Sequence, residues 1–166
     1  MPAAHDPARR RLLLGRPGEP APLRPPWALG ETAFIDTCTG CNACVERCPQ
    51  QVLVRADGGY PAFDPHRGEC TFCGECVDSC RTGAIARHAG APAWSLRAHV
   101  DAGCLARQGV VCASCADACP ERAIAFRPAL PVSTPAVDTA RCTGCGACVN
   151  SCPVDAMELL PEAGRA

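Results

Sequence analysis

Cysteine is the residue type that could do chemistry in this chain, because sixteen cysteines stand in four groups along 166 residues. The groups are CTGCNACVERCP (38–49), CTFCGECVDSCR (70–81), CLARQGVVCASCADACP (104–120) and CTGCGACVNSCP (142–153). With only two Trp, one Tyr and four Phe, the chain is too poor in aromatic residues for a conventional large core. Disulfides or bound metal must therefore supply much of its cohesion.

Three of the groups have the spacing C-x2-C-x2-C-x3-C, which is the bacterial ferredoxin pattern for [4Fe–4S] clusters. Three cysteines two residues apart wrap a loop around three corners of a cube. The fourth, one helical turn later, points away and closes the neighbouring cube. The expected ligand sets are Cys38, Cys41, Cys44 with Cys80; Cys70, Cys73, Cys76 with Cys48; Cys104, Cys112, Cys115 with Cys152; and Cys142, Cys145, Cys148 with Cys119. The sixteen cysteines thus supply four ligands to each of four clusters, and no cysteine is left over.

Two other uses of cysteine compete with this interpretation. Zinc sites usually include histidine, and none of the four histidines stands at ligand spacing. Disulfides need an oxidising compartment, and the segment ARRRLLLGRPGEP (8–20) does resemble the start of an export signal. Its apolar run is three leucines long, whereas a secretory signal needs about 7–15 apolar residues. We therefore expect an uncleaved N-terminus, a cytoplasmic protein without a membrane span, and cysteines that bind metal.

Two groups depart from the common pattern. Arg81 stands where the other three groups have proline, but Cys80 keeps its spacing and is still expected to be a ligand. In the third group, seven residues separate Cys104 from Cys112. Cys104 is then either a ligand that the loop returns to the cluster or a free thiol. The closed count of sixteen cysteines favours the ligand.

The spacing of the groups predicts the organisation of the chain. Their second cysteines lie 32, 39 and 33 residues apart, which indicates two pairs joined by a linker at 86–99. Each group should form a short helix between its third and fourth cysteines and then lead through an apolar pair into a short strand, and residues 55–65 read as a hairpin turn. The predicted fold is α+β: two tandem bacterial-ferredoxin-like modules, each with two [4Fe–4S] clusters. The expected boundaries are a flexible Arg/Pro-rich arm at 1–30, modules at 31–88 and 89–160, and a tail at 161–166.

Nothing outside the cysteine groups indicates catalysis. The chain has neither a GxGxxG dinucleotide motif nor a phosphate-binding loop, and its formal net charge of −1 gives no case for nucleic acid. We expect a protein that is not itself an enzyme, whose clusters store or pass single electrons.

Several flanking pieces carry a more specific resemblance. They are RRRLLLG near the start, RPPW at 24–27, GGYPAF between the first two groups, AWSL at 93–96, AIAFRPAL at 123–130 and the long spacing CLARQGVVC. In these pieces the chain resembles the NapF family, the ferredoxin-type accessory proteins of periplasmic nitrate reductase systems. Because the long spacing is shared, the resemblance favours Cys104 as a ligand.

The resemblance implies a cytoplasmic protein that contacts the catalytic subunit of periplasmic nitrate reductase, in its precursor form, before export. It would assist maturation by cluster assembly or electron supply, and the arm with Arg9, Arg10 and Arg11 would dock on a partner or remain a solvated tail. A different class of function stays open, an electron carrier between a quinol dehydrogenase or other donor and an oxidoreductase. A structural subunit of a larger oxidoreductase is a third alternative.

Overall fold

The computed structural model describes residues 22–162. The chain divides into two compact units. Unit 1 holds residues 22–64 and 74–93, and unit 2 holds residues 65–73 and 94–162. The division cuts through the second cysteine group, whose first part belongs to unit 2 and whose remainder belongs to unit 1. Residues 1–21 of the expected arm, with Arg9, Arg10 and Arg11, and residues 163–166 of the expected tail lie outside the described residues.

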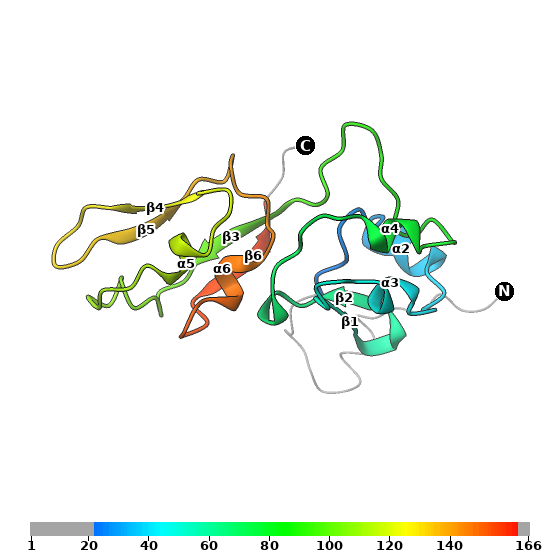
Figure 1. The fold of residues 1–166 in the computed structure, drawn as a ribbon, viewed down its shortest axis with the longest axis horizontal. Helices are drawn as coiled ribbons and strands as arrows, with labels where there is room; N and C mark the ends of the chain where they lie inside the picture. Colours follow the sequence, from blue (N-terminus) through cyan, green and yellow to red (C-terminus); the bar gives the residue numbers. More distant parts are fainter. Residues whose placement is uncertain (1–21, 163–166) are drawn as a thin grey trace. The chain divides into compact units, whose positions relative to one another are not determined.

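Unit 1 is built around the hairpin of β1 (Leu53–Arg55) and β2 (Pro61–Phe63), which are antiparallel with Leu53 opposite Phe63 (Figure 1). The turn between them contains the short helix η1 (Asp57–Gly59), where Gly58 has a φ of 79°. Glycine adopts this left-handed conformation without a steric cost. The hairpin expected from Asp57 and Gly58 is confirmed.

The segment before the first cysteine group is more ordered than the expected arm. Pro26 is fully buried, Ala28 forms a β-bridge with Ile85, and the amide of Trp27 donates to the carbonyl of Ala93 at 2.6 Å. Helix α2 (Glu31–Thr37), which the sequence did not predict, follows at once and buries Phe34 completely. Residues 22–30 therefore pack as an edge of unit 1. An extended proline-rich segment suits that position because it has few amide groups to satisfy.

Unit 2 contains two pairs of antiparallel strands (Figure 1). Strand β3 (Leu96–Val100) pairs with β6 (Met157–Pro161), and β4 (Ile124–Arg127) pairs with β5 (Thr134–Val137). Strand β3 begins inside the stretch that was expected to be linker. Its alternate residues Leu96, Ala98 and Val100 are buried, which is the period of a half-buried strand.

The two units share a plan. In each, an inner hairpin follows the first short helix, and an outer pairing joins the start of the unit to its end: Ala28 with Ile85 in unit 1, and β3 with β6 in unit 2. The four expected short helices are confirmed as α3 (Ala43–Glu46), α4 (Glu75–Asp78), α5 (Ser114–Asp117) and α6 (Ala147–Asn150), and η2 (Pro65–Arg67) adds one turn to unit 2. Short strands and short helices make the fold α+β, as predicted.

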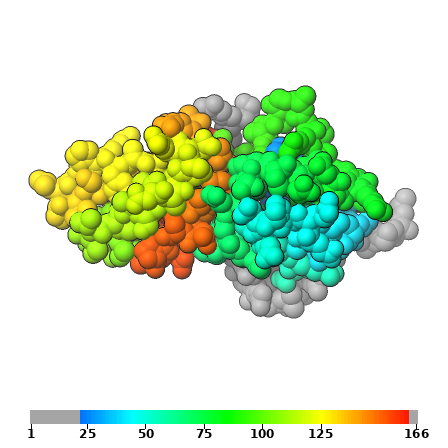
Figure 2. Space-filling model, viewed as in Figure 1, coloured from blue at the N-terminus to red at the C-terminus, as the bar shows by residue number. Residues whose placement is uncertain are grey.

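The insertion in the third group lies at the surface of unit 2, beside the tip of the β4–β5 hairpin (lime and yellow in Figure 2). A Cβ atom placed on Gly109 would lie 3.5 Å from the Cγ of Pro131. Val111 and Leu130 are 85% and 100% exposed. The insertion buries Ala106, but its end at Val111 is exposed and lengthens a surface loop.

Candidate metal centres

The loop around the second cysteine has the same backbone conformation in three of the four groups. The residues on both sides of that cysteine have positive φ: Gly40 and Asn42, Phe72 and Gly74, Gly144 and Gly146. Left-handed residues on both sides of the cysteine coil the chain tightly, and glycine adopts this conformation at no steric cost. In the third group Ala113 has a φ of −135° instead, so the seven-residue insertion changes the loop where it rejoins the pattern.

Each short helix buries the third cysteine of its group. Cys44, Cys76, Cys115 and Cys148 are only 7–8% exposed. In contrast, Cys41 and Cys73, the second cysteines of the first two groups, are exposed. The ligand candidates therefore span the boundary between core and solvent.

A second repeated turn follows the fourth cysteine. Three residues after it, Gln51, Gly83, Arg122 and Asp155 all have positive φ. The turn then directs a backbone amide at the preceding sulfur: Ile85 donates to Cys80 at 3.4 Å, Ala123 to Cys119 at 3.3 Å and Ala156 to Cys152 at 3.2 Å. Hydrogen bonds to cysteine sulfur stabilise the thiolate and tune the potential of any cluster that it binds.

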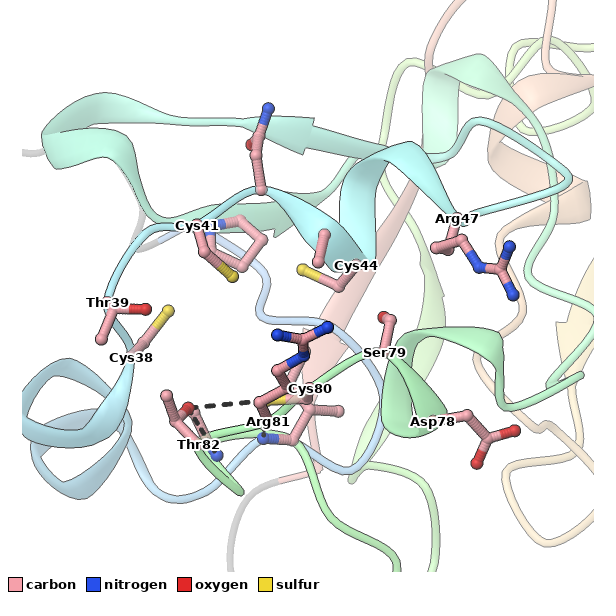
Figure 3. Close-up of a pocket in the computed structure, with 15 residues that line it drawn as sticks. Cys38, Thr39, Cys41, Cys44, Arg47, Asp78, Ser79, Cys80, Arg81 and Thr82 are labelled. Carbon is pink, nitrogen blue, oxygen red and sulfur yellow. Dashed lines mark hydrogen bonds between the residues drawn. The ribbon is translucent and has the colours of Figure 1, made fainter.

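The first ligand set comes together around one cavity in unit 1. Cys38, Cys41 and Cys44 line it together with Cys80, as Figure 3 shows, and its volume is about 530 Å³. Cys80 reaches this cavity from a segment well along the chain, which is what cross-ligation between paired groups requires. Four thiols around one roomy, partly apolar cavity fit a [4Fe–4S] cluster.

Within this set, the pKa of the buried Cys44 and that of the half-buried Cys80 shift in opposite directions. Burial and the neighbouring Cys38 and Cys80 raise the pKa of the Cys44 thiol to about 11. Burial also opposes ionisation of Cys80, but hydrogen bonds from the Ile85 amide and the Thr82 hydroxyl lower its pKa on balance. A buried thiol such as Cys44 is protonated at neutral pH unless a metal takes the proton's place.

The fourth ligand set is also brought together. Cys142, Cys145 and Cys148 line a cavity of about 20 Å³ in unit 2 together with Cys119. Burial and the neighbouring cysteines raise the pKa of Cys148 to about 12. Again the fourth cysteine comes from the paired group.

The third set includes Cys104. Burial, together with the nearby Cys104 and Cys112, raises the pKa of Cys115 to about 11. The insertion therefore returns Cys104 to the other two cysteines of its group. The expected fourth member, Cys152, follows Ser151, whose hydroxyl donates to the carbonyl of Ser114 at 3.4 Å.

The remaining set, Cys70, Cys73 and Cys76 with Cys48, is divided between the two units and stays a prediction. What the sequence did not predict is the position of its first part within unit 2. The amide of Cys70 donates to the carbonyl of Cys145 at 2.7 Å, and the rings of Phe72 and Trp94 meet edge to face at 5.6 Å. No spacing rule reports such a contact, because it joins the second cysteine group to the fourth.

Across residues 22–162, no three His, Cys, Asp or Glu side chains converge closely enough to hold a single metal ion. The cysteines of the first set instead surround a wider space. Four thiols around a space of this width fit a [4Fe–4S] cluster.

Comparison with protein families agrees with the geometry. Residues 37–85 and residues 110–156 each match the family of 4Fe-4S dicluster domains. The protein is therefore an iron–sulfur protein of the ferredoxin class, with two such domains in tandem.

Similarity over nearly the whole chain defines the family more narrowly. The chain is 40% identical over 155 residues to ferredoxin-type protein NapF of Escherichia coli (strain K12), covering 92% of this chain and 93% of that protein. It is 39% identical over 138 residues to NapF of Haemophilus influenzae, covering 82% and 78%. The chain belongs to the NapF family of ferredoxin-type proteins.

A second group of relatives is named for a different process. The chain is 35% identical over 174 residues to the methylamine utilization ferredoxin-type protein MauM of Methylobacillus flagellatus, covering 91% of this chain and 74% of that protein.

Among the described residues, no helix is both long enough and apolar enough to cross a membrane.

Proposed function

We propose that this protein carries four [4Fe–4S] clusters, two in each dicluster domain, on the four cross-ligated sets of cysteines. The observation that carries the proposal is the cavity lined by Cys38, Cys41 and Cys44 together with Cys80. Its four thiols come from two groups in the order that the spacing requires. Each cluster, when bound, supplies a one-electron carrier.

The chain's own residues hold and insulate the ligands. The third cysteine of each group is buried among apolar side chains, which excludes water from one side of the site. Backbone amides then donate to Cys80, Cys119 and Cys152 and fix the direction of each sulfur. The exposed Cys41 leaves the first set close to solvent, where a partner can approach.

The partner that we propose is the precursor of the catalytic subunit of periplasmic nitrate reductase, met in the cytoplasm before export. Membership of the NapF family over more than nine-tenths of both chains supports this choice. In this role the protein assists maturation by supplying electrons or a cluster and performs no substrate chemistry of its own.

An anaerobic pull-down tests this proposal. The tagged full-length protein is recovered from the cytoplasm of nitrate-respiring cells, the N-terminus of each captured protein is sequenced, and iron is counted in the bait. We expect a nitrate reductase precursor with its export signal still attached. Recovery of mature subunits alone would contradict maturation before export. A bait with Cys41→Ser and Cys145→Ser shows whether capture depends on two of the proposed clusters.

The similarity to MauM favours a second candidate, an electron carrier between a donor such as quinol dehydrogenase and an oxidoreductase. A carrier exchanges electrons quickly and binds weakly, whereas a maturation factor holds its immature partner. A fully loaded bait with no stable partner, which reduces an oxidoreductase rapidly in stopped-flow experiments, would support the carrier.

A further inference from the structure

The residue after the fourth cysteine differs in one group. Pro49, Pro120 and Pro153 follow that cysteine in the first, third and fourth groups, whereas Arg81 follows Cys80 in the second. By cross-ligation, Cys80 belongs to the first ligand set. Arg47 and Arg141 precede Cys48 and Cys142, so an arginine directly follows a fourth cysteine only in this group.

Arg81 lines the same cavity as Cys38, Cys41, Cys44 and Cys80. Figure 3 shows its side chain extending from the Cys80 segment toward Cys44, across the space that the cysteines surround. Asp78 lines the cavity too, but its carboxylate points away from the four cysteines in the same view. The guanidinium is therefore the charge directed at the cluster position.

The other charges at this cavity leave Arg81 uncompensated. Arg47 also lines the cavity, but its guanidinium lies 3.7 Å from the carboxylate of Glu75. Within residues 22–162, Arg81 forms no hydrogen bond or ion pair. In unit 2, the only charged residue that lines the cavity of the fourth set is Glu121, which is acidic. The charged residues that line the two cavities thus differ in net sign, because Arg141, which donates to the carbonyl of Glu121 at 2.7 Å, does not line the cavity of the fourth set.

We propose that Arg81 raises the reduction potential of the cluster on Cys38, Cys41, Cys44 and Cys80 above that of the cluster on the fourth set. Reduction adds one negative charge to a cluster, and a nearby cation stabilises that charge while a nearby carboxylate opposes it. With both clusters bound, Arg81 would make the oxidised first-set cluster the favoured acceptor for one electron from the reduced fourth-set cluster, with no proton or atom transferred. Electrons that reach this protein therefore collect at the first set. This role deepens the proposed function and rests on its assignment of ligands to clusters.

Arg81 is exposed, so solvent screens part of its charge and the effect is moderate. Replacing Arg81 with glutamine should lower the ratio of reduced to oxidised cluster about threefold at a fixed solution potential. Because a tenfold change in this ratio corresponds to 59 mV in a one-electron couple, the threefold change corresponds to a shift of about 28 mV in the reduction potential. Lysine at the same position keeps the charge and should keep most of the potential.

The test is a redox titration of the full-length protein, purified anaerobically and followed by electron paramagnetic resonance. Cys41→Ser and Cys145→Ser first identify the signals of the first and fourth sets, because serine ligation alters the signal of its own cluster. In Arg81→Gln, only the first-set signal should titrate at a lower reduction potential. In Glu121→Gln, the fourth-set signal should instead titrate at a higher reduction potential. Arg55→Gln is the matched control, since it removes the same charge from unit 1 at a residue that does not line the cavity.

The results distinguish a wrong ligand assignment from a wrong role for Arg81. If Cys41→Ser alters no signal, the ligand assignment is wrong and the inference fails with it. If Cys41→Ser alters a signal that Arg81→Gln leaves in place, the ligand set stands and the role of Arg81 is refuted. The role is also refuted if Arg55→Gln causes an equal shift or if Arg81→Lys shifts as far as Arg81→Gln.

Discussion

The indole Nε1–H of Trp94 donates to the backbone carbonyl of Thr143 at 2.8 Å. Trp94 precedes strand β3, and Thr143 lies between two cysteines of the fourth ligand set. The bond thus ties the loop that carries Cys142 and Cys145 to the outer strand pair of unit 2. Trp94 therefore holds a loop of the fourth ligand set in place.

Replacing Trp94 with phenylalanine should remove this hydrogen bond and keep an aromatic ring against Phe72. The expected loss is about 1 kcal/mol of stability, the usual contribution of one such bond. The measurement is the denaturant concentration at which the visible cluster absorption is half lost under anaerobic conditions. Trp94→Ala, which also removes the ring contact, should lower this midpoint further. Equal midpoints for wild type and Trp94→Phe would refute the role of the bond.

Gly144 and Gly83 offer a matched pair of substitutions, because both have a φ of 76°. Alanine at Gly83 meets no atom within 4 Å, so Gly83→Ala should cost only the left-handed backbone term of about 1–2 kcal/mol. Alanine at Gly144 would place its Cβ 2.5 Å from the carbonyl oxygen of Leu96 and 2.8 Å from the Nε1 of Trp94.

Gly144→Ala should therefore destabilise the protein clearly more than Gly83→Ala, and it should break the Trp94 bond as well. The same bleaching midpoint measures both variants. If the two midpoints shift equally, the close approach of β3 to the fourth cysteine loop is not present in solution.

The cysteine spacing was enough to predict the short helices and the convergence of the first ligand set, and the turn residues within 55–65 were enough to predict the hairpin. These features are local or follow from a fixed repeat. Helix α2 and strand β3 were missed for a physical reason. Each is short, and its stability depends on burying Phe34 or on pairing with β6, a distant segment.

The packing of residues 65–73 with unit 2 could not be predicted either. The bond from the Cys70 amide to the Cys145 carbonyl joins positions far apart in sequence, and the spacing within each group says nothing about it. The sequence also could not predict which charged side chains line each cavity. Arg81 was visible in the sequence as a departure from proline, but only the structure directs its side chain at the cysteines.

Cys104→Ser tests whether the long third group supplies a ligand. Because Cys104 lies near Cys112 and Cys115, we expect the variant to lose or destabilise one cluster, lowering the iron content by about a quarter. Val111→Ser is the control, since it alters an 85% exposed residue of the same insertion and should leave the iron content unchanged. Full iron content and unaltered spectra in Cys104→Ser would show that Cys104 is a free thiol.

Thr82→Val tests the thiolate of Cys80 through pH. Burial opposes ionisation of Cys80, but the hydrogen bonds that it accepts, one of them from Thr82, lower its pKa overall. A lowered pKa means that the thiolate, which is the form that binds iron, is present at lower pH. Removing the hydroxyl should raise the pKa again, so cluster reconstitution should be slower than in wild type near pH 7.

The difference from wild type should shrink as the pH rises toward 9, where the thiolate forms more readily in both proteins. Comparing the two proteins at each pH cancels the effect of pH on iron and sulfide. Thr32→Val, at an exposed threonine of helix α2 that does not line this cavity, is the control and should follow wild type. A constant rate ratio across the pH range would contradict the proposed role of the hydroxyl.

The most direct test of the four-cluster assignment is to count iron and acid-labile sulfide in the full-length protein, purified without exposure to air, and to record its Mössbauer spectrum. With four irons and four sulfides in each of four clusters, we expect about sixteen of each per chain and only tetrahedral, sulfur-ligated iron. About eight iron atoms per chain, iron without matching sulfide, or zinc in its place would contradict the assignment of all sixteen cysteines to four clusters.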